Sequence, residues 1–345
     1  MRQIFEYHPV IGFRFIPGLK ARIPYERGGY LIRANATGFR NDFEFQREKR
    51  PGKRRVLLFG DSFTAGEGVS NGQRYGDYLE KLVPDLEVYN FALPATGTDQ
   101  HYLIYREFAS EMSHDAVIIA IFVENIRRVA SRYRYFLNAE GKRLLYAKPY
   151  YTFEGDRLVL RGIPPRKTPI SEGELSSGER GMVARTARFP RLKRLYGRLQ
   201  RSPAFRGVVV DSGMKDTLLR MSRYRPITEY DDPSGPAWRL MSMILEQWIT
   251  ESTRPVLVMP IPMYHYVMQL ADPSQYQQRF RATTVAAGGR FFDPLPAWMQ
   301  VKASERRRFF YRDGHLTPDG NKALATAMKG TVKELVSASE RRSPL

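Results

Sequence analysis

The sequence predicts a three-layer α/β/α sandwich with a parallel five-stranded sheet and a large insertion. Short apolar runs without alternation, such as residues 56–59, are typical of strands that are buried on both faces. Segments with helical apolar spacing separate these runs, and such alternation favours a right-handed parallel arrangement. Small or polar residues follow the runs, at the strand ends where open sheets of this class carry their chemistry.

The first half of the sheet comes from residues 51–128. Strands are expected near 55–60, 86–91 and 116–123, with a helix over 75–83 and a loop over 92–97. Ser62 directly follows the first strand, and Thr98 is a candidate cap for the helix after the loop. The third strand is the most apolar and β-branched run, so we expect it at the centre of the sheet, with Asn125 just beyond its end.

The second half follows after a long interval. An amphipathic helix is expected over 236–250, then a strand over 255–260, a helix over 273–287, a strand over 290–292 and a last helix over 318–338. Trp238 and Trp248 share the apolar side of the first of these helices and are expected in the core. Asp313 and His315 precede the last helix, which can bring them to the edge that carries Ser62.

Two regions lie outside this pattern. Residues 1–50, the N-terminal extension, predict short extended segments that pack on the core. Residues 129–235, the insertion, are basic and rich in Gly, Pro and Ser, with a short strand at 158–160 and a basic helix over 184–199. Because the insertion begins at the strand end that carries Asn125, we expect it to roof or flank the site. The α/β domain is then made of 51–128 and 236–338.

Composition limits the function classes. The 345 residues include no Cys, which excludes disulfides, Cys nucleophiles and thiolate metal sites. The net charge of +19 indicates an anionic partner, such as an acidic substrate or a membrane surface. Nucleic acid is not favoured, because no zinc finger, RRM signature or helix-turn-helix spacing is present. We see neither a secretory signal nor a membrane span and expect a cytoplasmic protein, with peripheral membrane association and the oligomeric state left open.

The strand ends bring together residue types suited to acyl transfer. A serine hydroxyl such as Ser62 is a weak nucleophile and needs an adjacent base. His315 can take and return a proton near neutral pH, and the Asp313 carboxylate can orient its ring. The Asn125 amide can stabilise a developing oxyanion.

These residues resemble the sequence blocks of the SGNH (GDSL-type) hydrolase superfamily. The matching blocks are Gly60-Asp61-Ser62-Phe63, Asn125 and Asp313-Gly314-His315, and the resemblance covers about residues 35–126 and 236–338. It implies a flavodoxin-like fold without a cofactor or metal, and esterase, lipase, carbohydrate deacetylase or acyltransferase activity.

The resemblance also implies residue roles. Ser62 is the expected nucleophile, His315 the base and Asp313 its partner. The expected oxyanion hole combines the Ser62 N–H, a backbone N–H of Ala95 or Gly97, and the Asn125 side chain.

The chain departs from the family pattern in three places. Ala95 stands where the second block usually has Gly. The third block, usually Gly-x-Asn-Asp, keeps only Asn125. The last block is Asp-x-His, a shorter spacing that resembles the sugar-modifying branches of the family.

Two further features of the sequence are a second serine motif and a cluster of arginines. The sequence Gly68-Val69-Ser70-Asn71-Gly72 matches a nucleophile elbow, but no strand precedes it, so Ser70 is not favoured. Basic side chains gather at the root of the insertion and are expected to bind an anionic substrate group: Arg127, Arg128, Arg132 and Arg134. The alternative is that they dock on an acidic partner or an anionic membrane.

The favoured function is a serine ester hydrolase that acts through an acyl-enzyme at Ser62. Its expected substrates are acyl esters of a carbohydrate or another polar, anionic compound. An acyltransferase would use the same residues, with a sugar hydroxyl in place of water. A binding protein with weakened turnover is the alternative from a different functional class.

Overall fold

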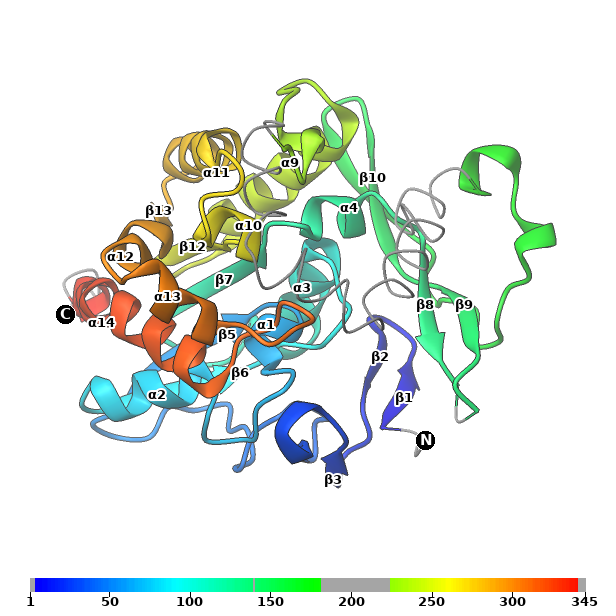
Figure 1. Ribbon diagram of the computed structural model, residues 1–345. Helices are drawn as coiled ribbons and strands as arrows, with labels where there is room; N and C mark the ends of the chain where they lie inside the picture. Colours follow the sequence, from blue (N-terminus) through cyan, green and yellow to red (C-terminus); the bar gives the residue numbers. More distant parts are fainter. Residues whose placement is uncertain (1–3, 139, 181–223, 341–345) are drawn as a thin grey trace, which may run out of the picture.

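The computed structural model describes residues 4–138, 140–180 and 224–340 (Figure 1). Five parallel strands form the central sheet in the order β13–β12–β7–β5–β6. Their bounds are Arg290–Phe291 for β13, Val256–Ile261 for β12, Ala116–Phe122 for β7, Arg54–Phe59 for β5 and Leu86–Asn90 for β6. This confirms the predicted parallel sheet, and β7 occupies its centre as expected.

Helices cover both faces of the sheet (Figure 1). On one face α2 (Tyr75–Leu82) packs against α14 (Pro318–Glu340); on the other lie α3 (Thr98–Ile104), α9 (Pro236–Glu251) and α11 (Ser274–Ala286). Shorter helices are α1 (Ser62–Ala65), α4 (Asn125–Val129), α10 (Tyr264–Val267), α12 (Leu295–Met299) and α13 (Ala303–Arg306). Within the described ranges, none of the helices combines the length and apolarity needed to cross a bilayer.

The core lies between the two helical layers and the sheet. All seven residues of β7 are buried, and Trp248 of α9 packs its ring 5.2 Å from the ring of Phe59. Burying an aliphatic or aromatic side chain of this size stabilises the fold by about 1.5–3 kcal/mol. The apolar runs of the sequence therefore become the sheet, because only its interior can bury both faces of a strand.

One cap prediction needs a small correction. Gly97, and not Thr98, is the N-cap of α3, while Thr98 is its first helical residue. The Thr98 hydroxyl is buried and finds no hydrogen-bond partner in the described chain. The extended backbone of Gly97 brings its Cα close to Arg128 and Asp99, so that a Cβ at this position would lie only 2.4 Å from Asp99 Oδ1.

The N-terminal extension forms two hairpins that lie beside the core (Figure 1). Their strands are β1 (Phe5–His8), β2 (Gly12–Phe15), β3 (Lys20–Ile23) and β4 (Tyr30–Arg33). Arg40 follows them and is fully buried, where it donates to the carbonyls of Ala65 and Gly66, both at 2.7 Å, and of Val69 at 2.9 Å. The extension is thereby fastened to the end of α1.

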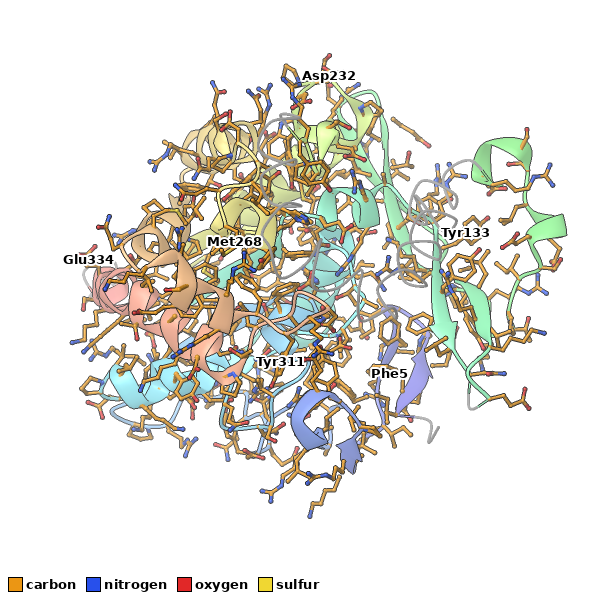
Figure 2. The ribbon with its side chains drawn as sticks, in the orientation of Figure 1. Phe5, Tyr133, Asp232, Met268, Tyr311 and Glu334 are labelled. Atoms are coloured by element: carbon orange, nitrogen blue, oxygen red, sulfur yellow. The ribbon has the colours of Figure 1, made fainter. Side chains whose placement is uncertain are left out.

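The described part of the insertion also forms two hairpins. Their strands are β8 (Tyr133–Leu137), β9 (Arg143–Ala147), β10 (Tyr150–Glu154) and β11 (Arg157–Arg161), so the short strand predicted at 158–160 belongs to the second hairpin. Phe136 of β8 packs 4.8 Å from Phe13 of β2, which joins the insertion to the N-terminal extension. Figure 2 shows Phe5 and Tyr133 on the same side of the molecule. The basic helix predicted over 184–199 lies outside the described residues.

Candidate active site

The Ser62 hydroxyl lies at the start of α1, immediately after β5. Asp61 is the N-cap of this helix, and its Oδ1 accepts the Phe63 N–H at 3.1 Å. Gly60 allows the turn to pass close to its neighbours, because an added Cβ would lie 2.2 Å from Thr64 Oγ1 and 2.9 Å from the Ala120 carbonyl. The Gly-Asp-Ser order therefore has a local explanation. Gly60 avoids a steric clash, Asp61 caps the helix, and the cap fixes the position of the Ser62 hydroxyl.

A series of hydrogen bonds joins Ser62 to the loop before α14. Ser62 Oγ lies 2.9 Å from His315 Nε2, and His315 Nδ1 lies 2.9 Å from Asp313 Oδ2. The Asp313 carboxylate only accepts hydrogen bonds when ionised, so Nδ1 carries the ring proton and Nε2 is left to accept from Ser62. The structure thus brings together the three residues to which the sequence assigned nucleophile, base and orienting acid.

The N-terminal extension contacts this series directly. The Tyr25 hydroxyl donates a short hydrogen bond to Asp313 Oδ2, and Glu26 Oε1 accepts the Arg312 N–H at 3.0 Å. From the core side, the Tyr311 hydroxyl donates to the Gly68 carbonyl at 3.0 Å, and Figure 2 labels Tyr311 near the centre of the molecule. The loop that carries Asp313 is therefore held from both sides.

The electrostatics favour an Asp313–His315 pair in which the carboxylate is ionised. Burial opposes the charged form of Asp313, but hydrogen bonds from His315 and Tyr25 outweigh it and lower the pKa of Asp313 to about 2. Burial likewise opposes the imidazolium of His315, yet the Asp313 hydrogen bond and the nearby Glu67 charge raise the pKa of His315 above its usual value. Glu67 Oε2 lies 3.8 Å from His315 Nε2. These shifts suit a ring that must hold a proton during a reaction.

The backbone N–H groups predicted as oxyanion donors differ in whether they already have a hydrogen-bond acceptor. Within the described chain, neither the Ser62 N–H nor the Ala95 N–H has an acceptor, while the Gly97 N–H is directed at Gln100 Oε1 at 3.4 Å. Ala95 has a φ of 64°, the left-handed region that glycine adopts without strain. Ala95 thus holds a conformation that glycine adopts at lower cost. The oxyanion roles themselves stay predictions.

Asn125 is tied to the nucleophile turn. Its Nδ2 donates to Asp61 Oδ2 at 2.6 Å, and Arg128 Nη1 donates to the same oxygen at 2.8 Å. One amide hydrogen of Asn125 remains for another acceptor, while its Oδ1 is buried without a partner in the described chain. Burial raises the pKa of Asp61, and the Arg128 charge acts against that shift. Asp61 therefore links α1 to α4.

The four arginines at the root of the insertion separate into different environments. Arg127 is bound by the Glu229 carboxylate at 2.7 and 2.9 Å. Arg132 lies 3.8 Å from Glu179 and over the ring of Tyr150. Arg128 binds Asp61, whereas Arg134 has no hydrogen-bond acceptor among the residues described. Their predicted role in binding an anionic substrate group remains a prediction.

Sequence reasoning missed the contributions of Tyr25, Glu67 and Asp61. Asp61 could have been found, since an Asp directly before a short helix is a frequent N-cap. Tyr25 could not, because it lies 288 residues from Asp313 in the chain. Ser70, set aside in the sequence, lies in a turn where its Oγ accepts the Leu31 N–H at 3.0 Å. Among the described residues, no cluster of three or more His, Asp or Glu side chains could hold a metal ion.

Comparison with known proteins found similarity only among solved structures. No protein-family model and no curated protein matches the chain. A member of the lipolytic G-D-S-L family from Veillonella parvula has 8% identity over 82% of this chain and 100% of its own, with a TM-score of 0.43. A lipase/acylhydrolase from Enterococcus faecalis has 13% identity over 81% and 96%, with a TM-score of 0.39.

The esterase AlinE4, described as a member of the SGNH-hydrolase family, has 14% identity over 83% of this chain and 98% of its own, with a TM-score of 0.37. The Veillonella parvula protein and AlinE4 are described with the two names of the family that the sequence blocks of this chain resemble. Because identities and TM-scores are this low, the functional argument depends on the residues of the site.

Proposed function

We propose that this chain is a serine ester hydrolase of the SGNH type, which forms an acyl-enzyme at Ser62. The observation that carries the proposal is the pair of 2.9 Å contacts from Ser62 Oγ to His315 Nε2 and from His315 Nδ1 to Asp313 Oδ2. This is the geometry of an activated hydroxyl, with the base oriented by an ionised carboxylate.

In the first half-reaction, Ser62 Oγ attacks the carbonyl carbon of the ester and its proton passes to His315 Nε2. The carbonyl oxygen becomes an oxyanion, for which the Ser62 and Ala95 N–H groups and the Asn125 amide are the proposed donors. When the intermediate collapses, the bond from carbon to the alcohol oxygen breaks. His315 returns its proton to that oxygen, and the acyl group remains on Ser62.

In the second half-reaction, water replaces the alcohol. His315 Nε2 accepts a proton from water as the water oxygen attacks the acyl carbon, and the same proton then returns to Ser62 Oγ as the acid leaves. Asp313 stays ionised throughout and stabilises the imidazolium at each stage, in agreement with its low pKa of about 2.

The proposed substrates are acyl esters of a carbohydrate or another polar compound. Two features support this class: the Asp-x-His spacing at Asp313 and His315, which resembles sugar-modifying branches of the family, and the net charge of +19. A sugar hydroxyl that entered in place of water would make the same chain an acyltransferase.

A fluorophosphonate probe tests the proposal on the purified full-length chain. We expect covalent labelling of the wild-type protein and none of Ser62→Ala, with Ser70→Ala labelled like the wild type. A panel of acyl esters, assayed with and without sugar acceptors, then separates hydrolysis from transfer. Labelling that persists in Ser62→Ala would place the nucleophile elsewhere, and an unlabelled wild-type protein would favour the non-catalytic binding protein.

A further inference from the structure

The described part of the insertion carries a half-buried arginine, Arg134, that forms no ion pair with another described residue. Arg134 lies on β8. Its Nε is shielded from solvent and has no hydrogen-bond acceptor in the described chain. No carboxylate of that part of the chain forms an ion pair with it, in contrast to Arg127 with Glu229. A polar atom that is shielded from solvent without a hydrogen-bond partner is costly, and an external acceptor would remove that cost.

The charges around Arg134 are already committed to one another. Asp61 accepts from Arg128 at 2.8 Å, and the buried Asp99 carboxylate is bonded to Lys148. Burial lowers the pKa of Arg134 to about 9, with the neighbouring Arg128 charge adding to the effect. Glu124, Asp61 and Asp99 act in the opposite direction without removing it. These carboxylates therefore act on Arg134 only at a distance, and within the described chain none of them accepts a hydrogen bond from its guanidinium.

Arg134 is linked to the proposed nucleophile through Arg128, with which it interacts electrostatically. Arg128 contacts Asp61, the residue before Ser62, and also donates to the Thr96 carbonyl in the loop after β6 at 3.2 Å. Arg134 acts electrostatically on both Arg128 and Asp61. An anion held by Arg134 would thus sit on the insertion side of the Ser62 turn.

We infer that Arg134 and Arg128 form an anion subsite beside Ser62, which binds a carboxylate or phosphate group carried by the ester substrate. Arg128 keeps Nη1 on Asp61 and can offer its other amino group, while the two amino groups of Arg134 have no acceptor in the described chain. Guanidinium groups bind these two anions through paired, charge-assisted hydrogen bonds. The inference deepens the proposed function and rests on it, and it selects two of the four arginines that the sequence singled out.

The first test compares two esters of the same acyl group and leaving group that differ only in one carboxylate. The quantity measured is the ratio of kcat/KM for the anionic ester to that for the neutral ester. We expect Arg134→Gln to lower this ratio about 10- to 100-fold, the scale of a charge-assisted hydrogen bond. Arg134→Lys should recover part of the ratio, because it restores the charge without the planar fork.

Arg143→Gln is the matched control. It removes one positive charge from the same hairpin, at an exposed arginine that lies over the ring of Tyr135. An unchanged ratio in Arg134→Gln would overturn the subsite, as would an equal fall in both variants, since that would indicate a general effect of net charge.

The second test does not depend on turnover. Inorganic phosphate is titrated by calorimetry into Ser62→Ala, and into the same protein with Arg134→Gln added. We expect binding to the first and at least a 10-fold weaker affinity in the second, with phosphate competing against the anionic ester in the active enzyme. Absence of phosphate binding, or binding that stimulates hydrolysis instead of competing, would overturn the inference. Fluorophosphonate labelling of Ser62 would still report separately on the proposed hydrolase.

Discussion

Arg40 in the N-terminal extension is fully buried and Arg134 in the insertion is half-buried, and their surroundings are opposite. Burial lowers the pKa of each to about 9, and a neighbouring arginine adds to the shift in both cases. Arg40 nevertheless donates to four carbonyls and to Asn71, whereas Arg134 has no acceptor in the described residues.

The comparison separates two ways in which regions outside the α/β core serve one site. The N-terminal extension completes contacts: Arg40 satisfies the carbonyls at the end of α1, and Tyr25 satisfies Asp313. In the insertion, by contrast, Arg134 has no hydrogen-bond acceptor among the described residues. A region whose polar groups are paired stabilises, while a region with an unpaired charge is suited to bind something else.

The largest expected effect is the loss of the Arg40 contacts. Arg40→Met leaves the carbonyls of Ala65, Gly66 and Val69 buried without donors, so we expect the free energy of unfolding to fall by about 3–5 kcal/mol. Urea unfolding followed by circular dichroism measures this. A change of less than about 1 kcal/mol would show that water replaces the guanidinium and that the extension is not fastened through this residue.

At the strand end from which the insertion begins, loss of Asn125 should lower turnover. Asn125→Ala should lower kcat by roughly 10²–10³-fold with little change in KM, because an oxyanion contact forms fully only in the transition state. Steady-state kinetics on an activated ester measures both constants. A rise in KM at constant kcat would contradict this role and would reduce Asn125 to a support for Asp61.

Tyr25→Phe tests whether the N-terminal extension reaches the chemistry. Loss of the hydrogen bond to Asp313 should lower kcat/KM about 10-fold, the scale of one hydrogen bond to a charged group. His315 must be neutral to act as a base, so activity falls as the pH drops through its raised pKa. With Asp313 no longer shared with Tyr25, its charge acts more strongly on His315, and the acidic limb should move to higher pH.

Tyr7→Phe is the control for Tyr25. Tyr7 is another phenol of the extension, and its hydroxyl donates to the Pro165 carbonyl at 3.1 Å, away from the triad. Its acidic limb should match the wild type. If both variants shift the pH profile alike, or neither does, Tyr25 is a structural residue only.

Arg134→Met should change the free energy of unfolding in the opposite direction to Arg40→Met. Without anion, removal of a half-buried charge that has no ion-pair partner in the described chain should raise stability by about 1 kcal/mol, or the Tm by about 2 °C. Thermal unfolding in a buffer free of phosphate and carboxylate measures this shift. A loss of stability similar to that of Arg40→Met would mean that Arg134 is satisfied, and the contrast between the two regions would disappear.

The smallest expected effect concerns Ala95, in the loop after β6, which belongs to neither the N-terminal extension nor the insertion. Ala95→Gly relieves a left-handed alanine but increases the freedom of the unfolded chain, so the net gain should stay below about 1 kcal/mol. Differential scanning calorimetry should show a Tm raised by 1–2 °C at most, on the order of that energy. A lowered Tm would show that the Ala95 methyl group contributes packing that outweighs its strain.

Local patterns predicted the sheet and the three triad candidates. The bounds of the strands and of the main helices lie within about two residues of those expected, because a strand buried on both faces, such as β7, has to be written as a continuous apolar run. Ser62, Asn125, Asp313 and His315 could be singled out for a related reason. Each follows a strand or precedes a helix, and parallel strands deliver such residues to one edge.

The sequence by itself therefore determined the parallel α/β architecture and the residue types gathered at one edge of the sheet. Only the tertiary structure decided which charges are paired there. The sequence alone does not distinguish Arg40, Arg127 and Arg134. Arg40 finds acceptors 9 to 31 residues away, Arg127 finds a Glu 102 residues away, and Arg134 finds none in the described chain. Hydrophobic burial follows from local composition, whereas an ion pair or hydrogen bond depends on two or three ångströms between atoms far apart in sequence.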